Sequence, residues 1–183
     1  MKKTLIKQKI YIYVFIMLLS ITLVVPSLAK ADTDNLSLDT IVELMRNAQQ
    51  EDNEYGPFPA SGERTPRRIV NALVTGYSSD IWQCDSTPFT PAMSNYNLKT
   101  NAELGIVDTV AANFLPLGTK VRFPDLFGDK VFTVRDRMNA KYNGTTRVDI
   151  YFALLNADGK LDAKTSRQAA VTFGVKRLKM EVF

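Results

Sequence analysis

Two aspartates are the residues whose type and spacing best suit acid–base chemistry. Asp136 and Asp149 lie near the two ends of the segment VRDRMNAKYNGTTRVDIYF, Val134 to Phe152, a polar turn-like stretch between apolar strands. Two carboxyl groups can serve as a general acid and a general base. They can equally be solvated charges at strand ends, since most aspartates are exposed.

The absence of histidine narrows the possible chemistry. The 183 residues contain no histidine and one cysteine, Cys84. Ser-His-Asp and Cys-His catalysis and His-based zinc sites are therefore excluded, and no metal or cofactor is expected. Acid–base chemistry must come mainly from carboxylates. A single cysteine cannot form an internal disulfide, so the fold must rest on its hydrophobic core.

The first 31 residues have the pattern of a secretory signal peptide. Lysines precede an apolar run from Ile10 to Val25, and Ala29 and Ala31 form an Ala-x-Ala cleavage site. We expect cleavage after Ala31 and export to a periplasmic, cell-wall or extracellular location, with no stable membrane insertion afterwards. The alternative is an uncleaved anchor, because the apolar run is nearly long enough to span a bilayer.

This segment also determines the sign of the net charge. Residues 1–31 hold five of the 23 basic residues and no acidic residue, so the rest of the chain carries 18 basic against 19 acidic residues. The net charge thus changes from +4 to −1 on cleavage. No basic patch is interleaved with aromatic residues, so we expect no nucleic-acid partner.

Residues 32–68 are predicted to form a leader. Ile41, Leu44, Met45 and Ala48 have helical spacing, and Thr40 with Glu43 fits a capping box. We expect a short helix that packs on its own domain, with a docking helix as the alternative. A linker rich in proline and glycine follows.

Residues 69–183 are predicted to form one β domain. Strand patterns occur in IVNALVTGY, GTKVRFP, KVFTVRD, RVDIYF and VKRLKMEVF, and AKTSRQAAVTFG predicts one helix that ends at Gly174. Many short strands with one or two short helices indicate a small, mostly β barrel.

Several segments together resemble a known family. VTGYSS, TPFTPA, NFLPLGTKVRFP, FTVRDRMN, RVDIYF and AAVTFGVKRLKMEV resemble the three-aspartate (3D) domain over roughly Val74 to Val182. That family belongs to the double-psi β-barrel group, with RlpA-like proteins and the catalytic domain of membrane-bound lytic transglycosylase A. The resemblance implies a six-stranded double-psi barrel that acts on peptidoglycan glycan strands.

The resemblance also implies a reaction. Lytic transglycosylases cleave the MurNAc–GlcNAc bond without water, because the 6-hydroxyl of the sugar attacks its own anomeric carbon and leaves a 1,6-anhydro product. One carboxyl group can protonate the leaving oxygen and then accept the proton of the hydroxyl.

The matching positions supply candidate residues. The catalytic second aspartate corresponds to Asp136, and the third corresponds to Asp149, which we expect to orient or tune Asp136. Thr90 matches a threonine or serine of the family and Lys141 falls in its Ile-Lys region, so both are predicted to bind substrate. Tyr77 is predicted to stack on a sugar ring and Trp82 is suited to the same role, although buried aromatics at strand ends are the simpler reading.

Two departures from the family pattern leave alternatives open. An ungapped match places Ala111 at the first aspartate position. Asp108 lies three residues earlier and can bind substrate in its place only if the chain bulges there. Arg137 and Met138 replace two glycines. The alternatives are a barrel that binds wall glycan or protein without cleavage and, less favoured, an inverting hydrolase, which needs two carboxyls roughly 6.5–9.5 Å apart.

Overall fold

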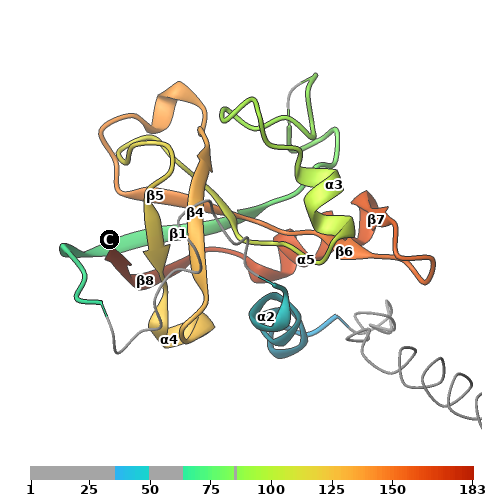
Figure 1. The fold of residues 1–183 in the computed structure, drawn as a ribbon, viewed down its shortest axis with the longest axis horizontal. Coiled ribbons are helices and arrows are strands. Elements are labelled where there is room, and N and C mark those ends of the chain that lie inside the picture. Colours follow the sequence, from blue (N-terminus) through green and yellow to red (C-terminus); the bar gives the residue numbers. More distant parts are fainter. Residues whose placement is uncertain (1–35, 50–63, 85) are drawn as a thin grey trace, which may run out of the picture.

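Six strands close into a barrel in this structure, a computed structural model that describes residues 36–49, 64–84 and 86–183. The predicted signal peptide and most of the predicted linker lie outside the described residues. In barrel order the strands are β1 (Arg68–Tyr77), β5 (Arg147–Tyr151), β2 (Thr109–Ala112), β4 (Val131–Asp136), β3 (Lys120–Arg122) and β8 (Lys176–Val182). Figure 1 labels β1, β4, β5 and β8 among them. The predicted small, mostly β barrel with a few short helices is confirmed.

The strand pairings leave no open edge in the barrel. Strands β1 and β5 are parallel, as are β2 and β4, whereas the other four pairs are antiparallel. Each strand has two partners, so its backbone donors and acceptors have neighbours on both sides. Positions on adjacent strands are therefore held in a fixed register, which is what a precise site requires.

The interior of the barrel is filled by the alternating apolar residues that the sequence predicts. In β8, Met180 and Val182 are buried while Arg177 and Lys179 are exposed. Phe123 and Phe132 are fully buried with their ring centroids 5.7 Å apart. Burying a side chain of this size contributes about 1.5–3 kcal/mol, so the core alone can hold a chain that lacks a disulfide.

Helix α5 (Ala163–Phe173) covers β1 at one position that requires glycine. Asp162 caps the helix by accepting a hydrogen bond from the Thr165 amide at 3.1 Å. Where the helix crosses β1, a Cβ atom added to Gly76 would lie 3.1 Å from Ala170 Cα of the helix and 2.6 Å from the neighbouring Phe152 ring. The helix ends at Gly174, at φ 69°, as the sequence predicts.

Helix α2 (Leu38–Asn47) belongs to the same core. Ile41, Val42 and Met45 are buried within the hydrophobic cluster of the barrel, and Lys130 Nζ donates to the Ala48 carbonyl at 2.6 Å. The predicted packing of the helix on its own domain is confirmed. The predicted cap is wrong, because the helix begins earlier.

The true cap of α2 is Ser37. The Ser37 hydroxyl accepts a hydrogen bond from the Thr40 amide at 3.2 Å, which places Thr40 inside the first turn. Asp39 also lies in that turn, where its charge is favourable at the positive end of the helix dipole.

The remaining elements are short. They are α3 (Leu98–Glu103), α4 (Pro124–Phe127), the 3-10 turn η3 (Ala140–Tyr142), and the hairpin of β6 (Leu154–Leu155) and β7 (Leu161–Asp162). None of the described helices is both long and apolar enough to cross a membrane.

Candidate active site

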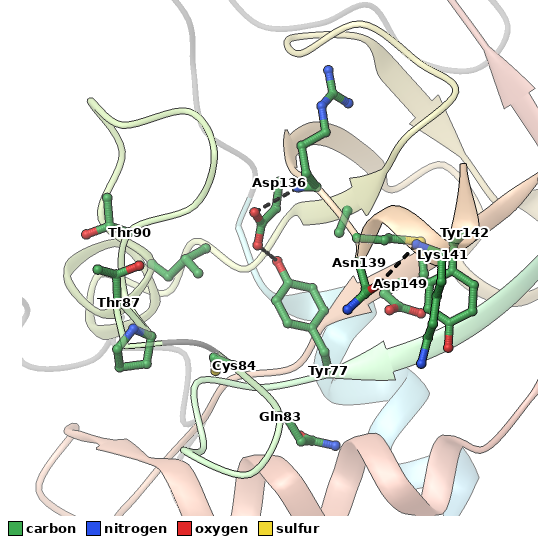
Figure 2. A pocket seen from close by; sticks show the side chains of 15 residues that line it. Tyr77, Gln83, Cys84, Thr87, Thr90, Asp136, Asn139, Lys141, Tyr142 and Asp149 are labelled. Carbon is green, nitrogen blue, oxygen red and sulfur yellow. Dashed lines mark hydrogen bonds between the residues drawn. The ribbon is translucent and has the colours of Figure 1, made fainter. Parts of the chain in front are cut away.

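A pocket of about 590 Å³ contains both candidate carboxyl groups. Its walls are formed by residues of four barrel strands, β1, β2, β4 and β5, by the loop before α3 and by the turn after β4 (Figure 2). The lining residues are Tyr77, Gln83, Cys84, Thr87, Pro88, Thr90, Leu98, Ala111, Asp136, Arg137, Met138, Asn139, Lys141, Tyr142 and Asp149.

The two aspartates lie on either side of Ala111. In the strand register Ala111 pairs with Asp136 of β4 on one side and with Asp149 of β5 on the other. Two inter-strand spacings separate the Cα atoms of the aspartates by roughly 10 Å. The small side chain between them leaves space in the pocket where a reacting group can lie.

A β-bulge brings Asp136 into this register. Val110 pairs with Val134, whereas the next residue, Ala111, pairs with Asp136, so Arg135 is the extra residue on β4. A bulge changes the direction of the side chains that follow it, and bulges are frequent next to active sites. Here Arg135 is buried while Asp136 faces the pocket.

Three neutral donors hold the Asp136 carboxylate. Its Oδ1 atom accepts hydrogen bonds from the backbone amides of Ala92 at 3.0 Å and Arg137 at 2.8 Å. Its Oδ2 atom accepts one from the Tyr77 hydroxyl at 3.0 Å (Figure 2). A carboxylate has about four lone-pair sites, so these bonds fix its orientation and leave a site for one more donor.

Tyr77 serves as one of these donors. Burial, followed by the charge of Asp136, raises the pKa of Tyr77 well above its usual value, so its hydroxyl keeps its proton. Its ring packs against Tyr151 with a centroid distance of 5.3 Å. The hydroxyl of Tyr77 is thus directed at Asp136, a role that the predicted sugar stacking did not include.

Asp149 has a different environment from Asp136. The Thr75 hydroxyl donates a hydrogen bond to its Oδ1 atom. Burial raises the pKa of Asp149 to about 6, against the opposing effect of Arg147 and with a smaller contribution from the Asp136 charge. Asp149 therefore keeps a proton over a pH range in which most aspartates are ionised.

The guanidinium group of Arg137 does not neutralise Asp136. It donates to the carbonyl oxygens of Ala112 and Leu115, at 2.7 Å for the latter, and so ties the turn after β4 to the end of β2. Asn113 braces the same turn by accepting from the Met138 amide at 2.8 Å and donating to Asn143 Oδ1 at 2.8 Å. Arg137 and Met138 thus belong to a fixed wall of the pocket.

The pocket brings together five of the six predicted site residues. Thr90 and Lys141 line it together with Tyr77, Asp136 and Asp149. The Thr90 amide donates to the Thr87 carbonyl at 3.0 Å, so Thr90 also belongs to a turn. Lys141 is exposed, and its Nζ atom lies 5.0 Å from the centre of the Tyr142 ring.

Asp108 lies outside this pocket. It is only 2% exposed, and its oxygens accept from Arg135 Nη1 at 2.6 Å and Nη2 at 3.2 Å. The chain does bulge, but the extra residue is Arg135 on β4, and its side chain binds Asp108 within the protein. The structure thus places Ala111, not Asp108, between the two pocket aspartates.

Sequence reasoning missed several residues that shape the site. Thr75 lies two residues before Tyr77 on the same strand, which was a usable indication that it faces the same side. No local sequence pattern indicated the role of Asn113, because its hydrogen-bond partners lie 25 and 30 residues further along the chain.

The chain matches no known protein family and no curated protein. Among the described residues, no group of three or more acidic or cysteine side chains is placed to hold a metal ion.

Proposed function

We propose that this protein is an exported enzyme that cleaves peptidoglycan glycan strands in the manner of a lytic transglycosylase. The observation that carries the proposal is the placement of Asp136 and Asp149 in one pocket on either side of Ala111. We also propose that the barrel is a double-psi barrel of the 3D type. Its two parallel strand pairs and the position of Ala111 between two aspartates support that assignment.

The two carboxyl groups divide the proton transfers in this proposal. Asp149, with its pKa near 6, donates its proton to the glycosidic oxygen as the bond from that oxygen to the anomeric carbon breaks. The 6-hydroxyl oxygen bonds to the same carbon, and its proton passes to the Asp136 carboxylate. The product is a 1,6-anhydro sugar, and exchange with solvent returns both carboxyls to their starting states.

The fixed hydrogen bonds of Asp136 suit it to the role of base. Its donors are two backbone amides and a tyrosine hydroxyl, which orient the carboxylate without adding a positive charge beside it. An orientation that is fixed before substrate binds costs no reorganisation during the reaction.

Digestion of purified sacculi followed by mass spectrometry tests the proposal. The unaltered protein is expected to release anhydro-muropeptides, and Asp136→Asn and Asp149→Asn are each expected to lower the rate by about 10²–10⁴-fold. Asp129→Asn is the matched control, because its side chain is 74% exposed and it does not line the pocket. Anhydro products formed equally well by Asp136→Asn would refute the proposed role of the pocket.

A second candidate is an inverting hydrolase on the same barrel. The separation of the aspartates by one intervening strand favours it, because inverting enzymes need room for a water between their carboxyls. Products with a reducing end instead of an anhydro ring would identify this reaction. Glycan binding without any product would indicate the non-catalytic binding barrel.

A further inference from the structure

We propose that the turn carrying Trp82 is a sugar-binding platform that extends the pocket along the glycan strand. The inference rests on the proposed substrate class and adds a subsite to it. Trp82 would stack on a sugar ring of the strand outside the two that react between Asp136 and Asp149.

Trp82 and its neighbour are unusually exposed. Trp82 is 76% exposed and Ile81 is 74% exposed, the highest values among the large apolar side chains of the described residues. The next two residues, Gln83 and Cys84, line the pocket. The exposed indole therefore belongs to the turn that forms part of the pocket rim, and exposed apolar groups at such a place mark a binding surface.

Hydrogen bonds hold this turn in one conformation. Asp80 Oδ1 accepts from the Trp82 amide at 2.9 Å, and the Asp80 carbonyl accepts from the Gln83 amide at 2.8 Å. Ser78 Oγ donates to the side chain of Gln83 at 2.6 Å, and Cys84 Sγ donates to the Ser78 carbonyl at 2.9 Å. A ligand that stacks on Trp82 therefore does not have to order the backbone first, which favours binding.

The size and lining of the pocket indicate a carbohydrate occupant. A volume of about 590 Å³ is that of a small-molecule site, so only a short part of a glycan strand fits and the rest must pass over the rim. Hydroxyl, amide and carboxyl groups such as those of Thr87, Gln83 and Asp136 match sugar hydroxyls. The weakly positive C–H face of a sugar ring is attracted to the negative face of an indole.

Fluorescence provides a direct test, because Trp82 is the single tryptophan of the chain. The full protein bearing Asp136→Asn, which should cut its ligand only slowly, is titrated with peptide-free glycan strands and with the MurNAc–GlcNAc disaccharide. Calorimetry measures the affinities independently. We expect the long strands, but not the disaccharide, to change the tryptophan emission.

Three further variants in the same background define the contribution of the ring. Trp82→Ala is expected to bind long strands roughly tenfold more weakly, as for a single exposed binding residue. Its affinity for the disaccharide should not change. Trp82→Phe should recover part of the loss, and Val171→Ala, which removes a 59% exposed apolar side chain on α5, should cause none.

The outcomes separate this inference from the proposed reaction. Unchanged emission at saturation, full affinity in Trp82→Ala, or no strand binding at all would each overturn the platform, whatever sacculi digestion shows. Strand binding that depends on Trp82, without cleavage products in the sacculus assay, would keep the platform and refute the enzyme.

Discussion

Two acidic regions at neighbouring positions of the same strands have opposite environments. Asp108, just before β2, forms an ion pair with Arg135 inside the protein, and both side chains are 2% exposed. Asp136, beside Ala111 of β2, accepts only from amides and a hydroxyl and faces the pocket. The comparison shows that the role of a buried aspartate depends on its hydrogen-bond donors. A guanidinium group neutralises the charge of the carboxylate, whereas neutral donors orient the carboxylate and leave its negative charge available.

The largest expected loss of stability follows from breaking the buried ion pair of Asp108 and Arg135. Asp108→Ala leaves the guanidinium of Arg135 buried without its carboxylate, so the free energy of unfolding should fall by about 3–5 kcal/mol. Denaturant unfolding measures the change. The double variant Asp108→Leu with Arg135→Met should recover most of it, because apolar residues of similar size can replace a buried pair. An equal loss of unfolding free energy in the single and double variants would show that the ion pair of Asp108 and Arg135 does not stabilise the pairing of β2 with β4.

The next largest effect is the pH dependence of stability that Asp149 causes. Its pKa of about 6 lies above the value of about 3.8 in an unfolded chain, so the folded state favours the protonated carboxyl. This contribution to stability is complete below about pH 4 and is lost as the pH rises through 6, with a total of up to about 3 kcal/mol.

Asp149→Asn should therefore be more stable than the unaltered protein at pH 8 and not at pH 4. Thermal or denaturant unfolding of both proteins at the two values measures the difference. Cleavage by the unaltered protein should also decline above pH 6, since the proposed acid loses its proton. A stability difference that is the same at both pH values would contradict the assigned environment of Asp149.

A smaller effect is expected for Tyr77→Phe. The change removes the hydroxyl that donates to Asp136 but keeps both backbone donors. A hydrogen bond to a charged group contributes about 1.5–3 kcal/mol, so the cleavage rate should fall by about 10–150-fold. A steady-state rate with soluble glycan measures the loss. An unchanged rate would mean that the two amides alone orient Asp136.

The smallest effect is expected at the exposed acid Asp129. Its nearest cationic atom is Arg122 Nη1 at 3.9 Å, and its side chain is 74% exposed. Asp129→Asn should change the free energy of unfolding by less than about 1 kcal/mol and leave cleavage unaffected. A larger destabilisation would show that an exposed aspartate is not a valid control for Asp108 and Asp136.

The sequence was sufficient for features that depend on local patterns. Alternation of apolar and polar residues predicted β8, and the glycine at position 174 marked the end of α5. The resemblance to the three-aspartate domain, and no local pattern, implied that Asp136 and Asp149 share a site, and the structure puts both in one pocket.

Features that depend on distant partners could not be predicted. The role of Asp108 is decided by Arg135, which lies 27 residues along the chain and is buried because of a bulge in the pairing of β2 with β4. The pKa of Asp149 depends on burial, which no local pattern reveals. The cap of α2 was misplaced because Ser37 and Thr40 are both good capping residues, and only the path of the chain chooses between them.

The pairing of β1 sets the order in which this chain can fold. Its two partners, β5 and β8, both lie far from it along the sequence. The barrel cannot close until both strands are available, and α2 has to wait for Lys130 and α5 before its apolar face is covered. Such long-range pairings make folding slower than it is for a chain with mainly local contacts. Until both distant strands have formed, β1 keeps an unpaired edge, which is a surface prone to pairing with other chains.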